Sequence, residues 1–491
     1  MGGAGPVSAR RIGRVIGPLA FIATALTAPP ERMTGEAWLV AGLVVWMAAW
    51  WMTEAVPLAV TALLPFIWLP LVGVMDARAT ASAYYAPILF LILGGAFLAL
   101  AIERTGLHRR LSLAILNRVG TGGTGKNGSF RLLIAFMASA ALLSMLISNT
   151  STALIMMPMA LAVLAGGAER EFGTAQGQET AFEYEGLFGA LPMGIAFAAT
   201  IGGLGTIVGS PTNGIAVQLL DDMIGLQITF AVWMAYGLPV VLVGVPIAAW
   251  IIAKVQRIDA HPFDLGAAQR AIADSGPWSS AERRLVPVVA LAFLLWMTRR
   301  WVAPLLPEGS WTDGTIAIIA ALTLFLIPDG TGRPLLKWSE ADRAPWGVIL
   351  MFGGGLALAA GMQASGLADW LGEALLPLEA VPLVLIGMAI VALVIVITEF
   401  ASNVATASAI IPVIASLAAA LGLGEDAILI AMPAALAASW GFILPAGTGP
   451  NAIAWATGRL RIERLVRAGL VLDLIGIALI VAMVWAVAAI S

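Results

Sequence analysis

Long stretches without any aspartate, glutamate, lysine or arginine recur from one end of this chain to the other. They include residues 37–53, 55–75, 79–102, 186–220, 223–253, 427–458 and 474–491. An α-helix needs about 20 apolar residues to cross a bilayer. With 60% hydrophobic residues, 11% charged residues and a mean hydropathy of +0.95, a chain of 491 residues cannot be a soluble globule. The sequence therefore predicts an all-α polytopic membrane protein.

The distribution of basic residues orients the predicted spans, because lysine and arginine favour cytoplasmic loops. Arg10, Arg11 and Arg14 place the N-terminus in the cytoplasm, which puts the C-terminus outside the cell membrane (a bacterial inner membrane is expected). Arg299 and Arg300 fall on the outer side in this scheme and have no explanation in it. We expect eleven transmembrane helices, near residues 12–28, 36–53, 55–75, 84–104, 186–220, 228–253, 284–303, 311–328, 345–366, 427–458 and 466–490.

Two further apolar runs are better explained as re-entrant hairpins than as spans. One covers residues 132–168, with its tip at Ser148–Thr150, and the other covers 380–422, with its tip at Ser402–Val404. Each half of the chain then holds five helices and one hairpin, and an odd number of spans inverts the second copy. The expected organisation is an N-terminal segment with the first helix, a first repeat, a cytoplasmic connector and a second repeat, at residues 1–35, 36–253, 254–283 and 284–491.

The same polar motif occurs inside an apolar run of each half. Ser148–Ala153 and Ser402–Ala407 match, and each is preceded at the same distance by a hydroxyl residue, Ser144 or Thr398. A glycine-rich break ending in asparagine follows in each half, at 209–213 and 447–451. Single polar residues in membrane helices often only bond a neighbouring helix. Two matching copies instead predict a two-fold binding site, because polar groups in lipid are costly and mark substrate and ion pathways.

The residue types in these motifs suit a cation and an anion together. Neutral oxygens of asparagine, serine, threonine and the backbone suit Na⁺, whereas helix N-termini attract anions. No lysine or arginine occurs between Arg131 and Arg170, between Arg170 and Lys254, or between Arg343 and Arg459. A bound dianion would therefore depend on bound cations for neutralisation. The chain has no cysteine and no evident nucleophile–base–acid cluster, so an enzyme is not expected, and nothing suggests a nucleic-acid partner.

The chain resembles the divalent anion/sodium symporters over nearly its whole length. The resemblance is carried by residues 50–57 (Trp-Trp-Met-Thr-Glu-Ala-Val-Pro), by both Ser-Asn motifs and by Pro450-Asn451. It implies a homodimer in which a mobile domain, holding both hairpins and both broken helices, moves like an elevator past a scaffold. It also implies co-transported sodium ions and an anionic substrate such as a dicarboxylate, citrate or sulfate.

By the same resemblance, Ser144 and Asn149 with backbone near Gly209 look like one sodium site, and Thr398 and Asn403 with backbone near Gly447 like another. Val404 stands where the second motif of the family often has threonine, and Gly449 where a proline is common, which leaves the substrate open. The residues implied to contact or line the substrate site are Asn149, Thr150, Ser210, Pro211, Ser402, Asn403, Val404, Thr448 and Gly449.

The sequence thus predicts a sodium-coupled secondary transporter of C4-dicarboxylates such as succinate, malate or fumarate. A sodium-independent dicarboxylate exchanger and a sulfate or citrate symporter of the same fold remain open. A different class is an antiporter that moves Na⁺ or H⁺ alone, with Glu399 as the carrier. In the transporter interpretation, Glu399 is either a proton-coupling group or a structural hydrogen-bond acceptor.

Overall fold

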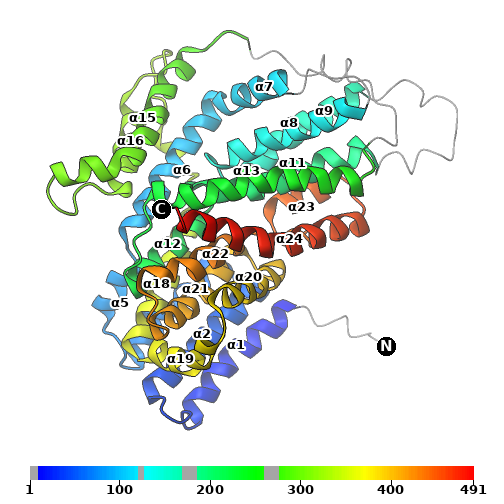
Figure 1. Ribbon diagram of the computed structural model, residues 1–491. Helices are drawn as coiled ribbons and strands as arrows, with labels where there is room; N and C mark the ends of the chain where they lie inside the picture. Colours follow the sequence, from blue (N-terminus) through cyan, green and yellow to red (C-terminus); the bar gives the residue numbers. More distant parts are fainter. Residues whose placement is uncertain (1–8, 120–125, 168–184, 259–275, 491) are drawn as a thin grey trace, which may run out of the picture.

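The computed structural model describes residues 9–119, 126–167, 185–258 and 276–490 (Figure 1). In these ranges all regular elements are helical, apart from one isolated bridge between Pro328 and Pro334. Ten of the described helices are long and apolar enough to cross a membrane. The predicted all-α membrane protein is confirmed. Most of the predicted connector 254–283 lies outside the described residues.

The first half of the chain contains twelve described α-helices and two short 3-10 helices. They are α1 (Ala9–Leu26), α2 (Gly35–Thr53), α3 (Leu58–Thr61), α4 (Leu64–Leu71), α5 (Ala77–Ala83), α6 (Pro87–Thr105), α7 (Leu107–Val119), α8 (Lys126–Ser144), α9 (Asn149–Gly167), α11 (Leu187–Gly202), η1 (Gly203–Gly205), η2 (Ile207–Gly209), α12 (Pro211–Ile224) and α13 (Phe230–Val255).

The second half follows with α15 (Ser280–Val302), η3 (Ala303–Leu305), α16 (Asp313–Leu326), α17 (Trp338–Ala341), α18 (Trp346–Ala364), α19 (Leu367–Leu375), η4 (Leu376–Ala380), α20 (Leu383–Phe400), α21 (Asn403–Ala420), η5 (Gly424–Ala427), α22 (Ile428–Ala437), α23 (Gly449–Ala456) and α24 (Ile462–Ala488). From α18 to α24 the helices have the same order as those from α6 to α13.

The segment expected as one span at 55–75 consists of two short helices, α3 and α4. Pro65 lies in the first turn of α4 and has no N–H to bond the carbonyl of Thr61, so a continuous helix is interrupted here. The hydroxyl of Tyr84 bridges the break, since it donates to Ala62 O at 2.6 Å and accepts from Phe66 N at 3.3 Å. Backbone groups freed by the break thus keep partners inside the protein.

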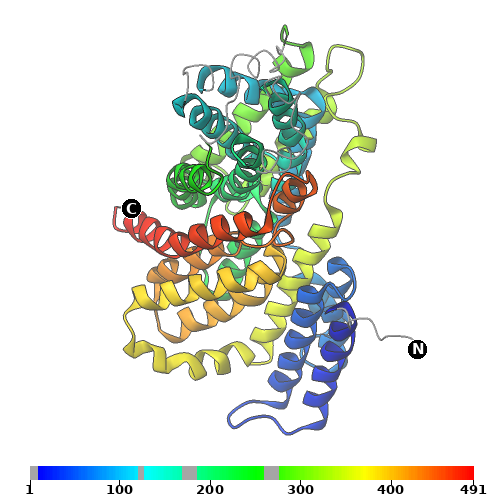
Figure 2. The same ribbon diagram turned by 90° about the vertical axis from the view of Figure 1, so that its right-hand side faces the viewer.

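Helix α11 lies at the centre of the larger hydrophobic core, packed against α8, α9 and α13. It is apolar on all sides, and 94% of its span is buried, as expected for a helix without a polar face. Gly202 permits this packing, because a Cβ there would lie 2.4 Å from Ala141 O of α8. Figure 2 shows α24 lying between this group and the helices α20 and α22, which it contacts.

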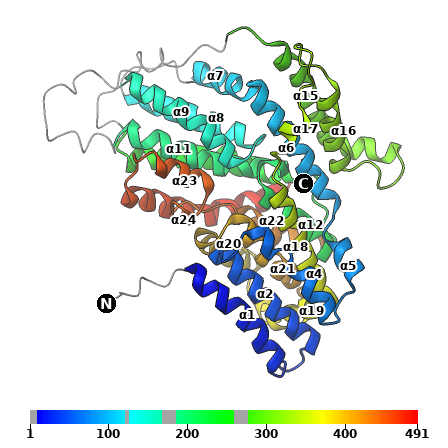
Figure 3. The same ribbon diagram turned by 180° about the vertical axis from the view of Figure 1, so that it is seen from behind.

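A second group of helices surrounds α2 and α18. Helices α1, α2, α3, α4 and α18 share a smaller hydrophobic core that includes Phe21, Trp51 and Met351. Figure 3 shows α1, α2 and α19 together at the end of the molecule away from α7, α8 and α9. Helix α6 packs against α16, and Gly94 allows the close approach because a Cβ there would lie 2.6 Å from the Ala317 backbone.

The basic pair Arg299-Arg300, which the topology could not explain, has local partners. Arg299 Nη1 lies 2.9 Å from the Asp313 carboxylate, which also accepts a hydrogen bond from Phe230 N at 2.9 Å. The guanidinium of Arg300 lies 4.3 Å from the ring centroid of Trp301. Arg299 therefore ties α15 to α16 and α13, which gives this arginine a structural role.

A network of charged residues fixes the loop between α16 and α18 to the end of α6. Arg104 donates to the buried carboxylate of Asp329, which also accepts bonds from Thr331 N and Oγ1 at 2.8 and 2.7 Å. Burial favours the neutral acid, but the hydrogen bonds from Thr331 and Arg104 outweigh it and hold the pKa of Asp329 below its ordinary value. The ionised form is therefore the one that stabilises this loop.

Replacing Asp329 with alanine should lower the free energy of unfolding by about 3 kcal/mol, because Arg104 loses its buried partner. The contribution should be complete above the unfolded-state pKa of about 3.9 and should fade as the pH falls below it, because folding depresses the pKa. Thermal unfolding of the detergent-purified variant, at neutral pH and at acidic pH, checks both statements. Glu308→Ala, which changes an exposed acid, is the control, and equal losses in the two variants would contradict the expectation.

Candidate functional site

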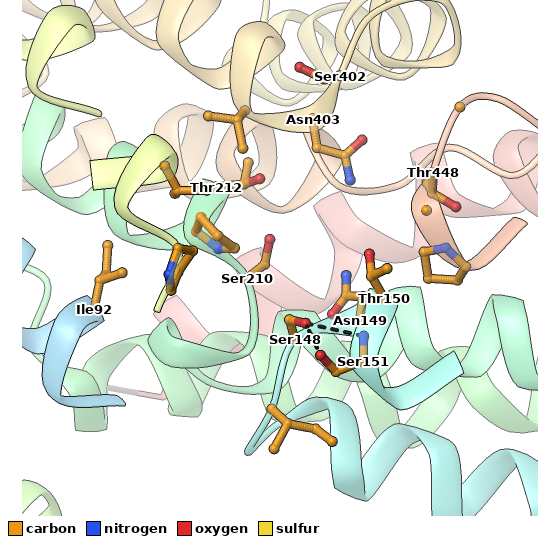
Figure 4. A pocket seen from close by; sticks show the side chains of 18 of the residues that line it. Ile92, Ser148, Asn149, Thr150, Ser151, Ser210, Thr212, Ser402, Asn403 and Thr448 are labelled. Atoms are coloured by element: carbon orange, nitrogen blue, oxygen red, sulfur yellow. Dashed lines mark hydrogen bonds between the residues drawn. The ribbon is translucent and has the colours of Figure 1, made fainter. Parts of the chain in front are cut away.

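A cavity of about 940 Å³ lies where two helix–helix turns and two broken helices meet. It is lined by the α8–α9 turn, the α20–α21 turn, the segment before α12 and the segment before α23. The ends of α2 and α6 and the start of α18 form the rest of its wall. Figure 4 shows Asn149, Thr150, Ser210, Asn403 and Thr448 gathered around this space.

The first turn joins α8 to α9 and is held by its own polar side chains. Ser144 Oγ donates to Asn149 Oδ1 at 2.7 Å, and Ser151 N donates to Ser148 Oγ at 3.2 Å. The turn itself covers residues 145–148, so Asn149 and Thr150, expected at the tip, lie in the first turn of α9. Their position directs the free backbone N–H groups of α9 toward the cavity.

The second turn repeats this arrangement between α20 and α21. Thr398 Oγ1 lies 2.9 Å from Asn403 Oδ1, the counterpart of the contact between Ser144 and Asn149, and its one hydrogen is shared with Ala438 O at 2.7 Å. Ser402 caps α21 by accepting a bond from Ala405 N at 3.3 Å. Val404 also lines the cavity, but it offers no hydroxyl.

Both broken helices are held by the asparagine that follows the break. Asn213 Nδ2 donates to Gly203 O and to Thr206 O, each at 2.8 Å. Asn451 Nδ2 donates to Leu444 O at 3.2 Å. These bonds satisfy carbonyl groups that a continuous helix would use internally. The sequence marked both asparagines as part of a motif but assigned them no role.

The residues of the first predicted sodium site lie together. A Cβ on Gly203 would lie 2.2 Å from Asn149 Oδ1, and a Cβ on Gly209 would lie 2.6 Å from Gly203 O and 2.9 Å from Ser144 O. Ser144 and Gly209 are buried behind the cavity wall. The set offers neutral oxygens only, which suits a monovalent cation. Gly203 was not predicted, because only the fold brings it against Asn149.

The second predicted site differs from the first by one carboxylate. Glu399, 4% exposed, accepts hydrogen bonds from Ile443 N at 2.8 Å and from Leu444 N at 2.9 Å. Its carboxylate lies 3.4 Å from the position that a Cβ on Gly447 would take. Met145 takes the equivalent position next to Ser144 at the first turn, and there the backbone O accepts from Thr206 Oγ1 at 2.6 Å. Glu399 thus acts as an acceptor for the broken helix, one of the two roles left open by the sequence.

Four helix N-termini converge on the cavity: those of α9, α12, α21 and α23. Each carries unpaired N–H groups and the positive end of a helix dipole, so together they favour an anion. Ser144, Gly209 and Thr398 lie behind the wall, and the other residues predicted for the site line the cavity: Asn149, Thr150, Ser210, Pro211, Ser402, Asn403, Val404, Gly447, Thr448 and Gly449.

The charged residues that line the cavity are Glu54, Glu103, Arg343 and Glu399, within the described part of the chain. The first three are exposed or half-exposed, and we call the solvent-exposed end of the cavity that they line the mouth. Near the turns, therefore, no cationic side chain among the described residues faces the cavity, in agreement with the arginine-free runs. The sequence did not predict that Arg343 lines the cavity, because this residue served only as the boundary of the run without lysine or arginine that ends at Arg459.

The comparisons with known proteins identify the family of the chain. The family model for the sodium:sulfate symporter transmembrane region matches residues 9–490. The chain is 38% identical over 485 residues to the sodium-dependent dicarboxylate transporter SdcS of Staphylococcus saprophyticus, covering 96% of this chain and 90% of that protein. It is 37% identical over 483 residues to SdcS of Staphylococcus aureus, with the same coverage.

Among solved structures, the Alcanivorax borkumensis YdaH transporter is similar in fold. The TM-score is 0.53 at 14% sequence identity, and the match covers 97% of this chain and 98% of that one.

Proposed function

The chain belongs to the family of the sodium:sulfate symporter transmembrane region, and from this premise we propose that it couples the uptake of a C4-dicarboxylate to sodium ions. The names of the curated relatives, which are sodium-dependent dicarboxylate transporters, support this substrate and this coupling ion. Succinate, malate and fumarate are the expected substrates.

The observation that carries the proposal is the paired construction of the cavity. Two turns, each with a hydroxyl-to-asparagine contact, stand on either side of the same space, and each opens a helix N-terminus toward it. A dicarboxylate has two anionic ends, so one carboxylate can bind at each turn. The two-ended site therefore favours a dicarboxylate.

Sodium supplies the positive charge that the cavity lacks. Ser144, Asn149 and the backbone near Gly209 form the first proposed sodium site, and Thr398, Asn403 and the backbone near Gly447 form the second. Between unit charges about 4 Å apart the attraction is about 4 kcal/mol at an effective dielectric of 20. Ion and substrate binding are then reciprocal, because each improves the affinity for the other.

We propose the transport mechanism and topology from the same features. An inverted repeat of five helices and one hairpin is supported by the repeated helix order and by the matched contacts of the two turns. In this scheme α8–α13 and α20–α24 form a body that moves elevator-fashion past the other helices, within a homodimer. Eleven spans, two hairpins, a cytoplasmic N-terminus and an external C-terminus complete the proposal, with repeats at 36–253 and 284–491.

Uptake of labelled succinate into proteoliposomes tests the function directly. We expect uptake that requires an inward sodium gradient and that malate, but not a monocarboxylate, inhibits. Uptake that ignores sodium but needs internal dicarboxylate would make the protein an exchanger. Inhibition by sulfate or citrate alone would keep the symport mechanism and change the substrate.

Glu399→Gln separates symport from an antiport of Na⁺ or H⁺ through this carboxyl group. A glutamine keeps one acceptor for the amides of Ile443 and Leu444 but turns an N–H group toward the other. We expect uptake to fall about tenfold, the cost of one impaired charge-assisted bond, and to remain sodium-dependent. The measurement is succinate uptake with and without a pH gradient, with Glu425→Gln, an exposed acid, as the control. If the wild type moved Na⁺ or H⁺ without any dependence on succinate, and Glu399→Gln abolished that ion movement completely, the antiporter would be favoured.

A further inference from the structure

Arg343 occupies an unusual position at the mouth of the cavity. It belongs to the short connection between α17 and α18, and it lines the cavity together with Pro345 and Val348. Its side chain is 57% exposed, so solvent and solutes reach the guanidinium. Of the described residues that line this cavity, Arg343 is the one with a positive charge.

The guanidinium of Arg343 is weakly held. Its nearest carboxylate is Glu103, with Nη1 and Oε1 3.9 Å apart, and the Glu103 side chain is itself 38% exposed. Exposed ion pairs at this distance contribute little, because water screens them. Arg333, which lies between α16 and α17, is different, since its Nη2 lies 2.5 Å from Glu340 Oε2. Arg343 can therefore exchange its carboxylate partner at low cost, whereas Arg333 cannot.

The charges around Arg343 explain what it would do for a dianion. Glu54 and Glu103 stand at the mouth and Glu399 lies deeper, so the lining carries more negative than positive charge. A dicarboxylate meets this field before it reaches the sodium sites and the helix N-termini. Glu54 has its own partner, because Arg10 Nη2 lies 3.2 Å from its Oε2. A guanidinium can bind a carboxylate through two parallel bonds, so a substrate carboxylate can replace Glu103 on Arg343.

We propose that Arg343 is an anion-capture residue, which exchanges Glu103 for a substrate carboxylate when the cavity is open at this mouth. The inference rests on the proposed function. It adds a substrate-binding residue, Arg343, and the side of the membrane from which the substrate reaches it. Arg343 precedes α18, outside the body proposed to move, and the mouth lies on the side that we propose to be cytoplasmic. The residue therefore acts on cytoplasmic substrate and has no contact with substrate that binds from the other side.

Succinate exchange in membrane vesicles of defined orientation tests this asymmetry. Half-saturating succinate is measured on one face while the other face is kept saturated with succinate and sodium. In inside-out vesicles, Arg343→Gln should raise the half-saturating concentration about three- to fivefold, the upper value of one exposed ion pair. In right-side-out vesicles it should stay within about twofold of the wild type, and the maximal rate should be kept on both faces.

Two further variants sharpen the result. Glu103→Gln removes the competing carboxylate, so it should lower the half-saturating concentration on the inside-out face. Arg300→Gln removes an equal charge far from the cavity, beside Trp301, and should change neither face. An equal rise on both faces, or no rise in Arg343→Gln vesicles, would overturn the inference. Absence of sodium-dependent succinate transport in wild-type vesicles would instead reject the proposed function.

Discussion

Replacing Asn403 with alanine is expected to reduce sodium-dependent succinate uptake at least about a hundredfold, and Asn149→Ala should do the same. Each asparagine presents its Oδ1 atom at the centre of a proposed sodium site and stands at the first residue of a helix facing the cavity. Alanine removes a ligand of the cation, and the substrate loses the positive charge that this cation supplies. The substitution therefore lowers the affinity for sodium and, through the missing sodium ion, the affinity for succinate.

The measurement is the initial rate of uptake over a range of sodium and succinate concentrations. Folding is checked separately by gel filtration and thermal unfolding, because Ser144 and Thr398 lose a bond partner. Asn117→Ala on α7 changes the same residue type away from the cavity and should retain wild-type uptake. Near-normal rates in folded Asn149→Ala and Asn403→Ala proteins would show that the turns bind neither sodium nor substrate.

Gly203→Ala should also be severe, with uptake reduced about thirty- to a hundredfold and a raised sodium requirement. The added Cβ would lie 2.2 Å from Asn149 Oδ1, a distance that no carbon–oxygen pair tolerates, so the amide must move. A displacement of about 1 Å at a binding oxygen is enough for an effect of this size. The substitution removes no polar atom, so its effect reports the geometry of the site and not the loss of a ligand.

The chain offers two comparisons for this variant. At Gly347 in α18 the nearest atom to an added Cβ is 3.9 Å away, so Gly347→Ala should be nearly silent. At Gly441, the counterpart of Gly203, the nearest atoms are 3.1 Å away, on Thr398 and Glu399, and a smaller loss is expected. From the highest uptake rate to the lowest, the expected order is therefore Gly347→Ala, Gly441→Ala and Gly203→Ala. A reversal of the last two would contradict the geometry of the first site.

The sequence was sufficient for the features that repeat within it. Apolar runs predicted the helices, and the matching motifs predicted the two turns and the two breaks, because each needs residues close together in the chain. The residues of these motifs line one cavity or lie directly behind it. Their roles in binding stay predictions until the variants above are measured.

Features that depend on contacts between distant segments could not be predicted. The break after Ala62 became understandable only with Tyr84, which satisfies both exposed backbone groups. The bond of Arg299 to Asp313, which gives this arginine a structural role, joins residues fourteen positions apart and had no signal in the sequence. Gly203 belongs to a glycine-rich segment, but neither it nor Arg343 could be assigned to the site, because one matters through Asn149 and the other through the shape of the cavity.

The bond between hydroxyl and asparagine inside each turn has a kinetic consequence. An amide oxygen has two lone pairs, and Ser144 or Thr398 occupies only one, leaving the other for an ion. If the proposed sodium sites are correct, the asparagine is already in its binding rotamer before sodium arrives, and the entropy of fixing it was lost when the protein folded. Ion arrival and departure then need no rearrangement of the turn. This contact between hydroxyl and asparagine therefore favours rapid exchange of sodium. It also lets the body proposed to move keep the same shape with and without substrate.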